Sequence, residues 1–319
     1  MNIKIFNPHD FPAYLPKLNS LFDDLFAGGK GFRSKLVQMV SEPLGVEEKT
    51  QHLLCQTIEF IHNASLLHDD LIDRSVLRRG KPAAWTKYSP EYAVLAGDYL
   101  LARVMVNLSG HGNIRLVQYT SEIISDLLEG EWLQDSVVGD FFVSNTQLDR
   151  IHNLKTASLF KWCLRAPFIA QNNNDQQTHQ LLEEMGTILG QLFQRSDDLL
   201  DYDIRNEEGK AILGDLRSGY LNSFGAFVSH RMSRPQIDQM VKSKTMNDFY
   251  KIFSSSEEEG KKIFLDKVHA FDQENGKLIE LYHHHLNELI KLTGLQSLEK
   301  SLRPLTDILY WRRRPMSPG

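Results

Sequence analysis

Apolar residues recur along most of the chain at the i, i+3, i+4 spacing of one helix face, as in residues 123–133 and 181–192. Prolines leave three long stretches free, 91–166, 168–234 and 236–303, and such stretches suit helices because proline interrupts them. Leu, Glu, Gln, Lys and Ala, which favour helix, fill these stretches. Alternating β-branched runs bounded by turn residues are rare. The pattern predicts an all-α chain of about ten or more helices.

Six breaks interrupt this helical pattern. They lie at residues 27–31, 74–90, 135–148, 171–177, 203–222 and 254–260. The last break, SSSEEEG, is acidic and rich in serine, so we expect a solvated loop there. None of the six has the composition of a domain linker, and we therefore expect one domain over residues 1–319.

Composition places the chain among ordinary globular proteins and excludes several function classes. Of its 319 residues, 41% are hydrophobic and 24% charged, with a net charge of −5. A negative chain is a poor general binder of nucleic acid, which needs a basic face. No apolar run approaches the roughly 18–20 residues of a membrane span, and the N-terminus resembles neither a signal nor a transit peptide. The two cysteines, Cys55 and Cys163, have no metal-site spacing, which fits a cytoplasmic protein.

Two aspartate clusters of the form D-D-x-x-D stand inside apolar helical segments, at residues 69–73 and 197–201. The first and last aspartate of each cluster are helix neighbours, and like charges at that spacing destabilise a helix. A cation should offset this loss, and Mg²⁺ suits because it is held by carboxylates together with substrate phosphates. The candidate ligands are Asp69, Asp70, Asp73, Asp197, Asp198 and Asp201.

The alternative for each cluster is a solvated acidic helix end or a capped helix start. Two copies deep within apolar segments favour a metal site instead, and the D-x-D-x-D-G spacing of a calcium loop is absent. Counting back from Asp69 along its face gives Ser65, His62 and Ile58. This stripe predicts a charged mouth above a deep pocket, although a lone histidine on such a face is more often a core residue.

Three basic clusters could bind the phosphates that such a metal site would handle. Lys30 and Arg33 lie in GGKGFRSK, Arg78 and Arg79 in LRRGKPAAW, and Lys155 precedes Thr156 in NLKTASLF. Any one of them alone would be interpreted as solvated surface. The position of Arg78 and Arg79 directly after the first aspartate cluster makes these two the strongest candidates.

Taken in order, these motifs resemble the trans-isoprenyl diphosphate synthases, also called polyprenyl synthetases. The resemblance covers about residues 28–220 and includes GGKGFR, IHNASLLHDDLIDRSVLRRGKPA, VLAGDYLLA, GEWLQ, KTASLF, GQLFQRSDDLLDY and GKAILGDLRSG. It implies an all-α helical bundle of the isoprenoid synthase type around a deep central cavity, in a homodimer. It also implies Mg²⁺, for which Mn²⁺ can substitute, and head-to-tail (1'-4, trans) condensation of an allylic diphosphate with isopentenyl diphosphate.

The resemblance assigns roles to individual residues. The six aspartates would hold the metal ions that clamp the allylic diphosphate, with Arg78 on the same group. Isopentenyl diphosphate would be bound by Lys30, Arg33, His62 and Arg79. The allylic cation would lie near Lys155, Thr156 and Gln194, and Lys210 would be a second diphosphate lysine.

Three departures from the family pattern stand out. Gly31 and Ser34 replace the arginine and proline of the first glycine motif. Arg195 and Ser196 stand before the second aspartate cluster, where apolar residues are usual. Tyr220 occupies the place of a late phosphate-binding lysine, and a phenol cannot supply its charge, unless Arg217 substitutes.

Product length depends, in this family, on the residues four and five before the first aspartate, which here are the small Ser65 and Ala64. Helix geometry places Ser65 beneath Asp69, whereas Ala64 is implied only by the resemblance. We therefore expect a product longer than farnesyl diphosphate, for a quinone or another isoprenoid that is delivered to membranes.

Three other functions compete with this prediction. A weakly active or regulatory subunit of a hetero-oligomeric synthase typically loses one aspartate motif, whereas this chain keeps both. A terpene cyclase usually replaces the second motif with an Asn/Ser/Glu type. A helical scaffold without chemistry leaves the paired acids unexplained.

Overall fold

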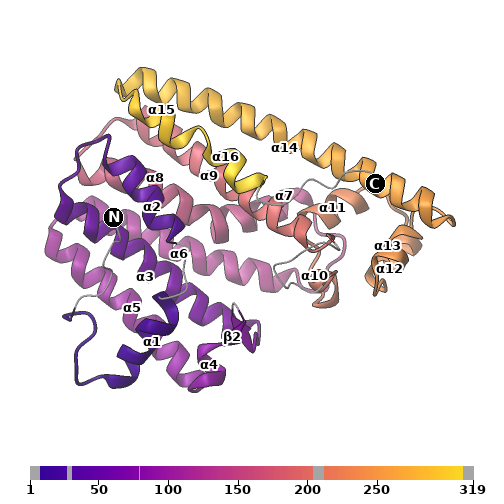
Figure 1. The fold of residues 1–319 in the computed structure, drawn as a ribbon, viewed down its shortest axis with the longest axis horizontal. Coiled ribbons are helices and arrows are strands. Elements are labelled where there is room, and N and C mark those ends of the chain that lie inside the picture. Colours follow the sequence, from indigo (N-terminus) through magenta and orange to yellow (C-terminus); the bar gives the residue numbers. More distant parts are fainter. Residues whose placement is uncertain (1–7, 27–30, 79, 204–211, 312–319) are drawn as a thin grey trace. The chain divides into compact units, whose positions relative to one another are not determined.

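The computed structural model describes residues 8–26, 31–78, 80–203 and 212–311, and it is all-α apart from one two-stranded hairpin (Figure 1). The chain divides into two compact units. Unit 1 comprises residues 1–125 and 159–183, and unit 2 comprises 126–158 and 184–319. The expectation of one domain over the whole chain stays a prediction.

Unit 1 is built around α3, which packs against α2 and α5. Residues 54–61 of α3 are buried on every side. Five of them are apolar, and the buried polar side chains of Gln56 and Glu59 are hydrogen-bonded to Asp10 and Ser34, respectively. The hairpin of Leu77–Arg78 with Lys81–Pro82 follows α3 directly. The elements of this unit are α1 (Pro16–Phe26), α2 (Phe32–Ser41), α3 (Glu48–Ile72), β1 (Leu77–Arg78), β2 (Lys81–Pro82), α4 (Ala84–Lys87), α5 (Pro90–His111), most of α8 (Ser158–Ala170) and the first parts of α6 (Ile114–Ser136) and α9 (Gln176–Leu200).

Unit 2 has a core of aromatic side chains beneath its longest helix, α14. Tyr202 packs edge-to-face against Phe224 and Phe249. Both phenylalanines pack in the same way against Phe264 of α14, and Phe224 also packs against Phe271 of that helix. Its elements, beyond the remainders of α6 and α9, are α7 (Asn145–His152), the π-helical turn η1 (Asn153–Ala157), α10 (Gly214–Arg217), α11 (Ser223–Ser229), α12 (Arg234–Val241), α13 (Met246–Tyr250), α14 (Glu257–Thr293), α15 (Ser297–Leu302) and α16 (Leu305–Tyr310).

Among the described residues, most of the break at 171–177 falls between α8 and α9 and most of that at 135–148 between α6 and α7, whereas α4 and α10 lie inside the breaks at 74–90 and 203–222. Residues 27–30 and 204–211, which belong to two of the breaks, lie outside the described residues.

The last break needs a correction. Helix α14 begins at Glu257, inside the segment 254–260 that we expected to be a loop. Ser256 caps it by accepting from Glu259 N–H, and three glutamates in its first turn favour the positive end of the helix dipole. The pattern also missed the end of α5 at Gly112, where the backbone has φ +85°.

Cys55 and Cys163 are both buried free thiols. Burial raises the pKa of Cys55 to about 12 and raises that of Cys163 as well, so both stay protonated. Among the described residues, no helix is long and apolar enough to cross a membrane.

Candidate functional site

The first aspartate motif forms the C-terminal end of α3. Asp73 N–H donates to the carbonyl of Asp69 at 2.8 Å, which confirms the helical spacing of the two outer aspartates. Asp69 is half-buried and Asp73 exposed, whereas Asp70 between them is only 5% exposed. The motif therefore directs its outer carboxylates toward solvent and its middle one inward.

Asp70 is neutralised by Arg78. The Nε of Arg78 donates to both carboxylate oxygens, at 2.9 and 3.1 Å, and Nη2 adds a further contact. The hairpin holds Arg78 in place, because Ser75 N–H bonds the Asp70 carbonyl and the Trp85 indole bonds that of Ser75. The Arg78 side chain is 40% exposed, so this cation is fixed beside the motif and still faces solvent.

Arg33 and His62, both predicted from sequence, lie together in unit 1. Arg33 Nη1 and His62 Nε2 are 3.1 Å apart. The next residue, Ser34, donates to the buried carboxylate of Glu59 from its hydroxyl and, at 3.2 Å, from its backbone N–H. The family pattern has a proline at this position. Here Ser34 joins the start of α2 to α3 through its two hydrogen bonds to Glu59.

The two chain-length candidates differ in their surroundings. Ala64 is fully buried, whereas Ser65 is half-buried on the face of Asp69. The Ser65 hydroxyl donates to the His62 carbonyl at 2.9 Å, within its own helix.

The second aspartate motif ends α9, in unit 2, and its middle residue Asp198 is held by neutral donors. Gln194 Nε2 donates to Oδ1 at 2.8 Å, and Ser223 donates to Oδ2 from N–H at 2.9 Å and from Oγ at 2.5 Å. Asp198 is 2% exposed. Burial raises its pKa, while the hydrogen bonds from Ser223 and Gln194 act in the opposite direction.

The outer aspartates of this motif are unlike each other. Asp197 is half-buried. Asp201 is 3% exposed, and its Oδ1 accepts from the N–H groups of Gly214 at 2.7 Å and Asp215 at 3.3 Å. Asp201 thus fixes the start of α10.

Lys155 and Thr156 lie in η1, where a π turn between α7 and α8 redirects the backbone. Two glycines make room for it, since a Cβ on Gly130 would lie 2.7 Å from Lys155 N and one on Gly190 would lie 2.3 Å from the Ala157 Cα. Thr156 Oγ1 donates to Gln194 Oε1 at 2.9 Å. Because its proton is directed at Gln194, the lone pairs of the threonine oxygen are available to another partner.

Tyr220 lies close to three carboxylates. Burial, then the carboxylates of Asp198, Asp215 and Glu131, raise its pKa, so the phenol stays neutral. Glu131 also forms an ion pair with Lys155. Arg217, considered as a replacement cation, is exposed and donates to the Lys244 carbonyl at 2.6 Å.

Three predicted residues, Lys30, Arg79 and Lys210, lie outside the described residues. Three others were missed by sequence reasoning: Glu59, Glu131 and Ser223. Glu59 could have been noticed in the sequence, because it is the one Asp, Glu, Lys or Arg in residues 50–67. Ser223 carried none, because its contact with Asp198 depends on a turn that brings together residues 25 positions apart.

The aspartate motifs offer few carboxylates at any one place, and this suits Mg²⁺ better than a metal that needs three or more protein ligands. Across the described residues, no group of three or more His, Cys, Asp or Glu side chains could hold a metal ion. Mg²⁺ is usually bound by only one or two carboxylates together with waters and substrate phosphates. The hard oxygens of Asp69 and Asp73, one helical turn apart, fit such a shared site.

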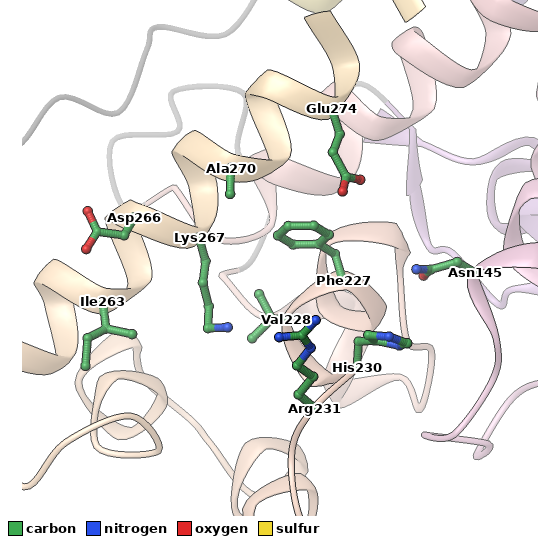
Figure 2. Close-up of a pocket in the computed structure, with 10 residues that line it drawn as sticks. All are labelled: Asn145, Phe227, Val228, His230, Arg231, Ile263, Asp266, Lys267, Ala270 and Glu274. Carbon is green, nitrogen blue, oxygen red and sulfur yellow. The ribbon is translucent and has the colours of Figure 1, made fainter. Parts of the chain in front are cut away.

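A separate hollow of about 620 Å³ opens on unit 2. Figure 2 shows that α14 and the end of α11 form its walls, with Asn145 at one end. None of the predicted site residues lines it. A smaller hollow of about 170 Å³ shares Asn145, Phe227 and Glu274 with it and reaches Ser223 and Arg195.

Comparisons with known proteins agree with these observations. A family model described as polyprenyl synthetase matches residues 15–266. The chain is similar to octaprenyl diphosphate synthase of Escherichia coli (strain K12), at 33% identity over 60% of this chain and 59% of the relative. It is also similar to decaprenyl-diphosphate synthase of Dictyostelium discoideum, at 32% identity over 84% of this chain and 57% of the relative. The chain thus spans less than two thirds of the length of these relatives.

The fold is also similar to that of a solved structure of a polyprenyl diphosphate synthase. The crystal structure of a decaprenyl diphosphate synthase from Rhodobacter capsulatus matches with a TM-score of 0.82 and 26% identity, over 95% of this chain and 92% of that one.

Proposed function

Because this chain belongs to the polyprenyl synthetase family, we propose that it is a prenyltransferase that joins an allylic diphosphate head-to-tail to isopentenyl diphosphate. The observation that carries this proposal is the pair of carboxylate helix ends, on α3 and on α9, each with its own polar partners. The outer aspartates of each motif repel one another, and a bound cation would offset that repulsion.

The charged residues of unit 1 would bind diphosphates. Mg²⁺ held by the outer aspartates would neutralise the diphosphate as it leaves the allylic carbon. Arg78, fixed by Asp70 yet 40% exposed, would contact the same group. Arg33 and His62, which meet at 3.1 Å, would hold the diphosphate of isopentenyl diphosphate. Lys30 and Arg79 are proposed for that group from the resemblance alone, and Lys210 is proposed as a second diphosphate-binding lysine.

The polar residues of unit 2 would stabilise the allylic cation. Asp198 orients Gln194 by accepting a hydrogen bond from its amide nitrogen, and the amide oxygen of Gln194 in turn accepts a hydrogen bond from the Thr156 hydroxyl. This chain of hydrogen bonds leaves the threonine oxygen as a fixed dipole for positive charge. Lys155 would add a phosphate contact.

The direct test is incubation of the purified protein with Mg²⁺, labelled isopentenyl diphosphate and a series of allylic primers. Product chromatography reads activity and chain length together. We expect elongation that stops in EDTA and returns with Mg²⁺ or Mn²⁺. Full turnover in EDTA, or no turnover with any primer, would contradict the proposal.

Two alternatives predict other results from the same assay. A regulatory or weakly active subunit of a hetero-oligomeric synthase would work only with a partner. The intact polar contacts of both motifs favour activity of this chain instead. A terpene cyclase would convert an allylic diphosphate without isopentenyl diphosphate, and the aspartates of the second motif argue against it.

We propose a product longer than farnesyl diphosphate, for a quinone or another isoprenoid. Relatives named for octaprenyl and decaprenyl products support this, as does the small Ser65 on the Asp69 face. Ser65→Phe should fill the path of the growing chain and shorten the product while leaving turnover of short primers intact. A wild-type protein that stops at farnesyl diphosphate, with excess isopentenyl diphosphate, would contradict this. A homodimer and a cytoplasmic location complete the proposal.

A further inference from the structure

Arg195, the unexpected charged residue before the second aspartate motif, lies at a junction of three helices in unit 2. From α9, its Nη2 is 2.9 Å from Asp149 Oδ1 on α7, and its Nη1 donates to Asn275 Oδ1 on α14 at 3.0 Å. Its guanidinium also lies 5.9 Å from the centre of the Phe271 ring. One side chain thus connects the helix of the motif to two others.

The connection to α7 bears on the reacting groups. Helix α7 continues directly into η1, which carries Lys155 and Thr156. Thr156 bonds Gln194, the residue beside Arg195. The α7–η1 segment is therefore held on α9 at two points, by Asp149 with Arg195 in the middle of α7 and by Thr156 with Gln194 in η1.

A second set of contacts extends this junction to the C-terminal helix. Ser196, the other unexpected residue, donates to the Tyr310 carbonyl of α16 at 2.9 Å. Tyr310 Oη accepts from Asn275 Nδ2 at 3.0 Å and donates to Asp272 Oδ1 at 2.6 Å. The two polar residues before the motif thus join α9 to one continuous hydrogen-bonded network.

Stability alone does not explain an arginine here. Its side chain is 16% exposed, and burying an ion pair often stabilises no more than apolar residues of similar volume. An arginine does offer a planar fork that reaches two acceptors at a defined angle, which an apolar side chain or a lysine cannot. The contacts therefore point to geometry.

We propose that Arg195 is a positioning residue: its bonds to Asp149 and Asn275 set the register of α7–η1 on α9, and so place Thr156 against Gln194 for the reaction. The inference rests on the proposed function. A further contact between α9 and η1, from Thr187 Oγ1 to Asn153 Oδ1 at 3.3 Å, does not involve Arg195, so we expect η1 to stay near α9 in an Arg195 variant while its register changes.

The test compares Arg195→Met with a matched control, Arg103→Met. Arg103 in unit 1 also contacts one aspartate, Asp10, at 2.8 Å, and one asparagine, Asn107, at 3.3 Å. Both variants should lower the melting temperature. Only Arg195→Met should lower kcat, on the order of 30-fold, because small misplacements of reacting groups cost up to about 100-fold. KM for isopentenyl diphosphate should stay within about twofold, since its proposed ligands are elsewhere.

Two further variants make the result decisive. Arg195→Lys keeps the charge without the fork and should recover only part of kcat. The double variant Asp149→Leu/Arg195→Met should lose no more kcat than Arg195→Met alone. The reason is that each substitution removes the same contact, the one between Asp149 and Arg195, so the second change has nothing further to break. Equal kcat for Arg195→Met and wild type, or equal kcat losses in the Arg195 and Arg103 variants, would overturn the inference. An inactive wild type would instead overturn the proposed function.

Discussion

The end of α3 in unit 1 and the end of α9 in unit 2 share the D-D-x-x-D spacing, but their third aspartates have opposite surroundings. Asp73 is exposed at the last turn of its helix. Asp201 is 3% exposed and binds the backbone at the start of α10. Position in the motif therefore does not decide whether a carboxylate faces solvent; for Asp201, contact with the backbone of Gly214 and Asp215 accompanies its burial.

The middle aspartates show a second contrast. Asp70 is paired with a cation, Arg78, whose side chain water still reaches. Asp198 is satisfied by uncharged donors that are themselves buried or half-buried. The first pairing holds a cation that stays accessible to solvent, whereas the second orients a neutral side chain, Gln194.

The largest effects should come from the outer aspartates that open each motif. We expect Asp69→Ala and Asp197→Ala each to reduce kcat on the order of 1,000-fold, because each removes charge that helps to stabilise a leaving diphosphate. Steady-state kinetics with saturating Mg²⁺ measures this. Thermal unfolding should change little, and a variant that keeps more than a tenth of wild-type kcat would remove that motif from the proposed site.

The middle aspartates should differ in stability. Asp198→Ala leaves the buried donors of Ser223 unsatisfied and should lower the free energy of unfolding by roughly 3 kcal/mol. Asp70→Ala leaves Arg78 partly in water and should lower it by about 1 kcal/mol. Urea denaturation of both variants measures the difference. Equal losses would mean that the two partnerships are energetically alike.

Acid should weaken unit 2 through His152. Burial lowers the pKa of His152 to about 4 from an ordinary 6.5, and neither ring nitrogen has a hydrogen-bond partner within the part of the chain that the structure describes. Below pH 6.5 the unfolded chain takes up a proton that the folded chain excludes until about pH 4. The free energy of unfolding should therefore fall by about 2 kcal/mol between pH 7 and pH 5 from this group.

His152→Leu should remove that part of the pH dependence, as measured by urea denaturation at several pH values. In unit 1, burial also lowers the pKa of His179, but this side chain has a partner, the Asn173 carbonyl at 3.0 Å. His179→Asn is the control and should change the slope less. The reverse order would show that acid acts mainly on unit 1.

The smallest effect should come from Tyr220. Tyr220→Lys places an ammonium group near Asp198 and Asp215. It should lower KM for the allylic diphosphate by about tenfold, which corresponds to the low end of the roughly 1.5–3 kcal/mol that one charge-assisted contact is worth. Tyr220→Phe, which adds no charge, should leave KM unchanged. If both variants behave as wild type, this turn does not reach the substrate.

Local chemistry made much of this predictable from the sequence. The 3.6-residue period, the turn residues and the two motifs identify helices, breaks and candidate carboxylates, because each depends on neighbours within a turn or two. The start of α14 was missed for the same reason, since an acidic, serine-rich run suits both a loop and a capped helix start.

The partners of the carboxylates depended on tertiary structure. The same five-residue pattern leads to an arginine eight residues away for Asp70, to a serine 25 residues away for Asp198, and to the start of another helix for Asp201. Arg195 likewise meets an aspartate 46 residues before it and an asparagine 80 residues after it. Sequence alone determined which groups carry charge and on which helix face they lie. Only packing decided which of them are buried, since burial and pairing depend on segments that no local pattern relates.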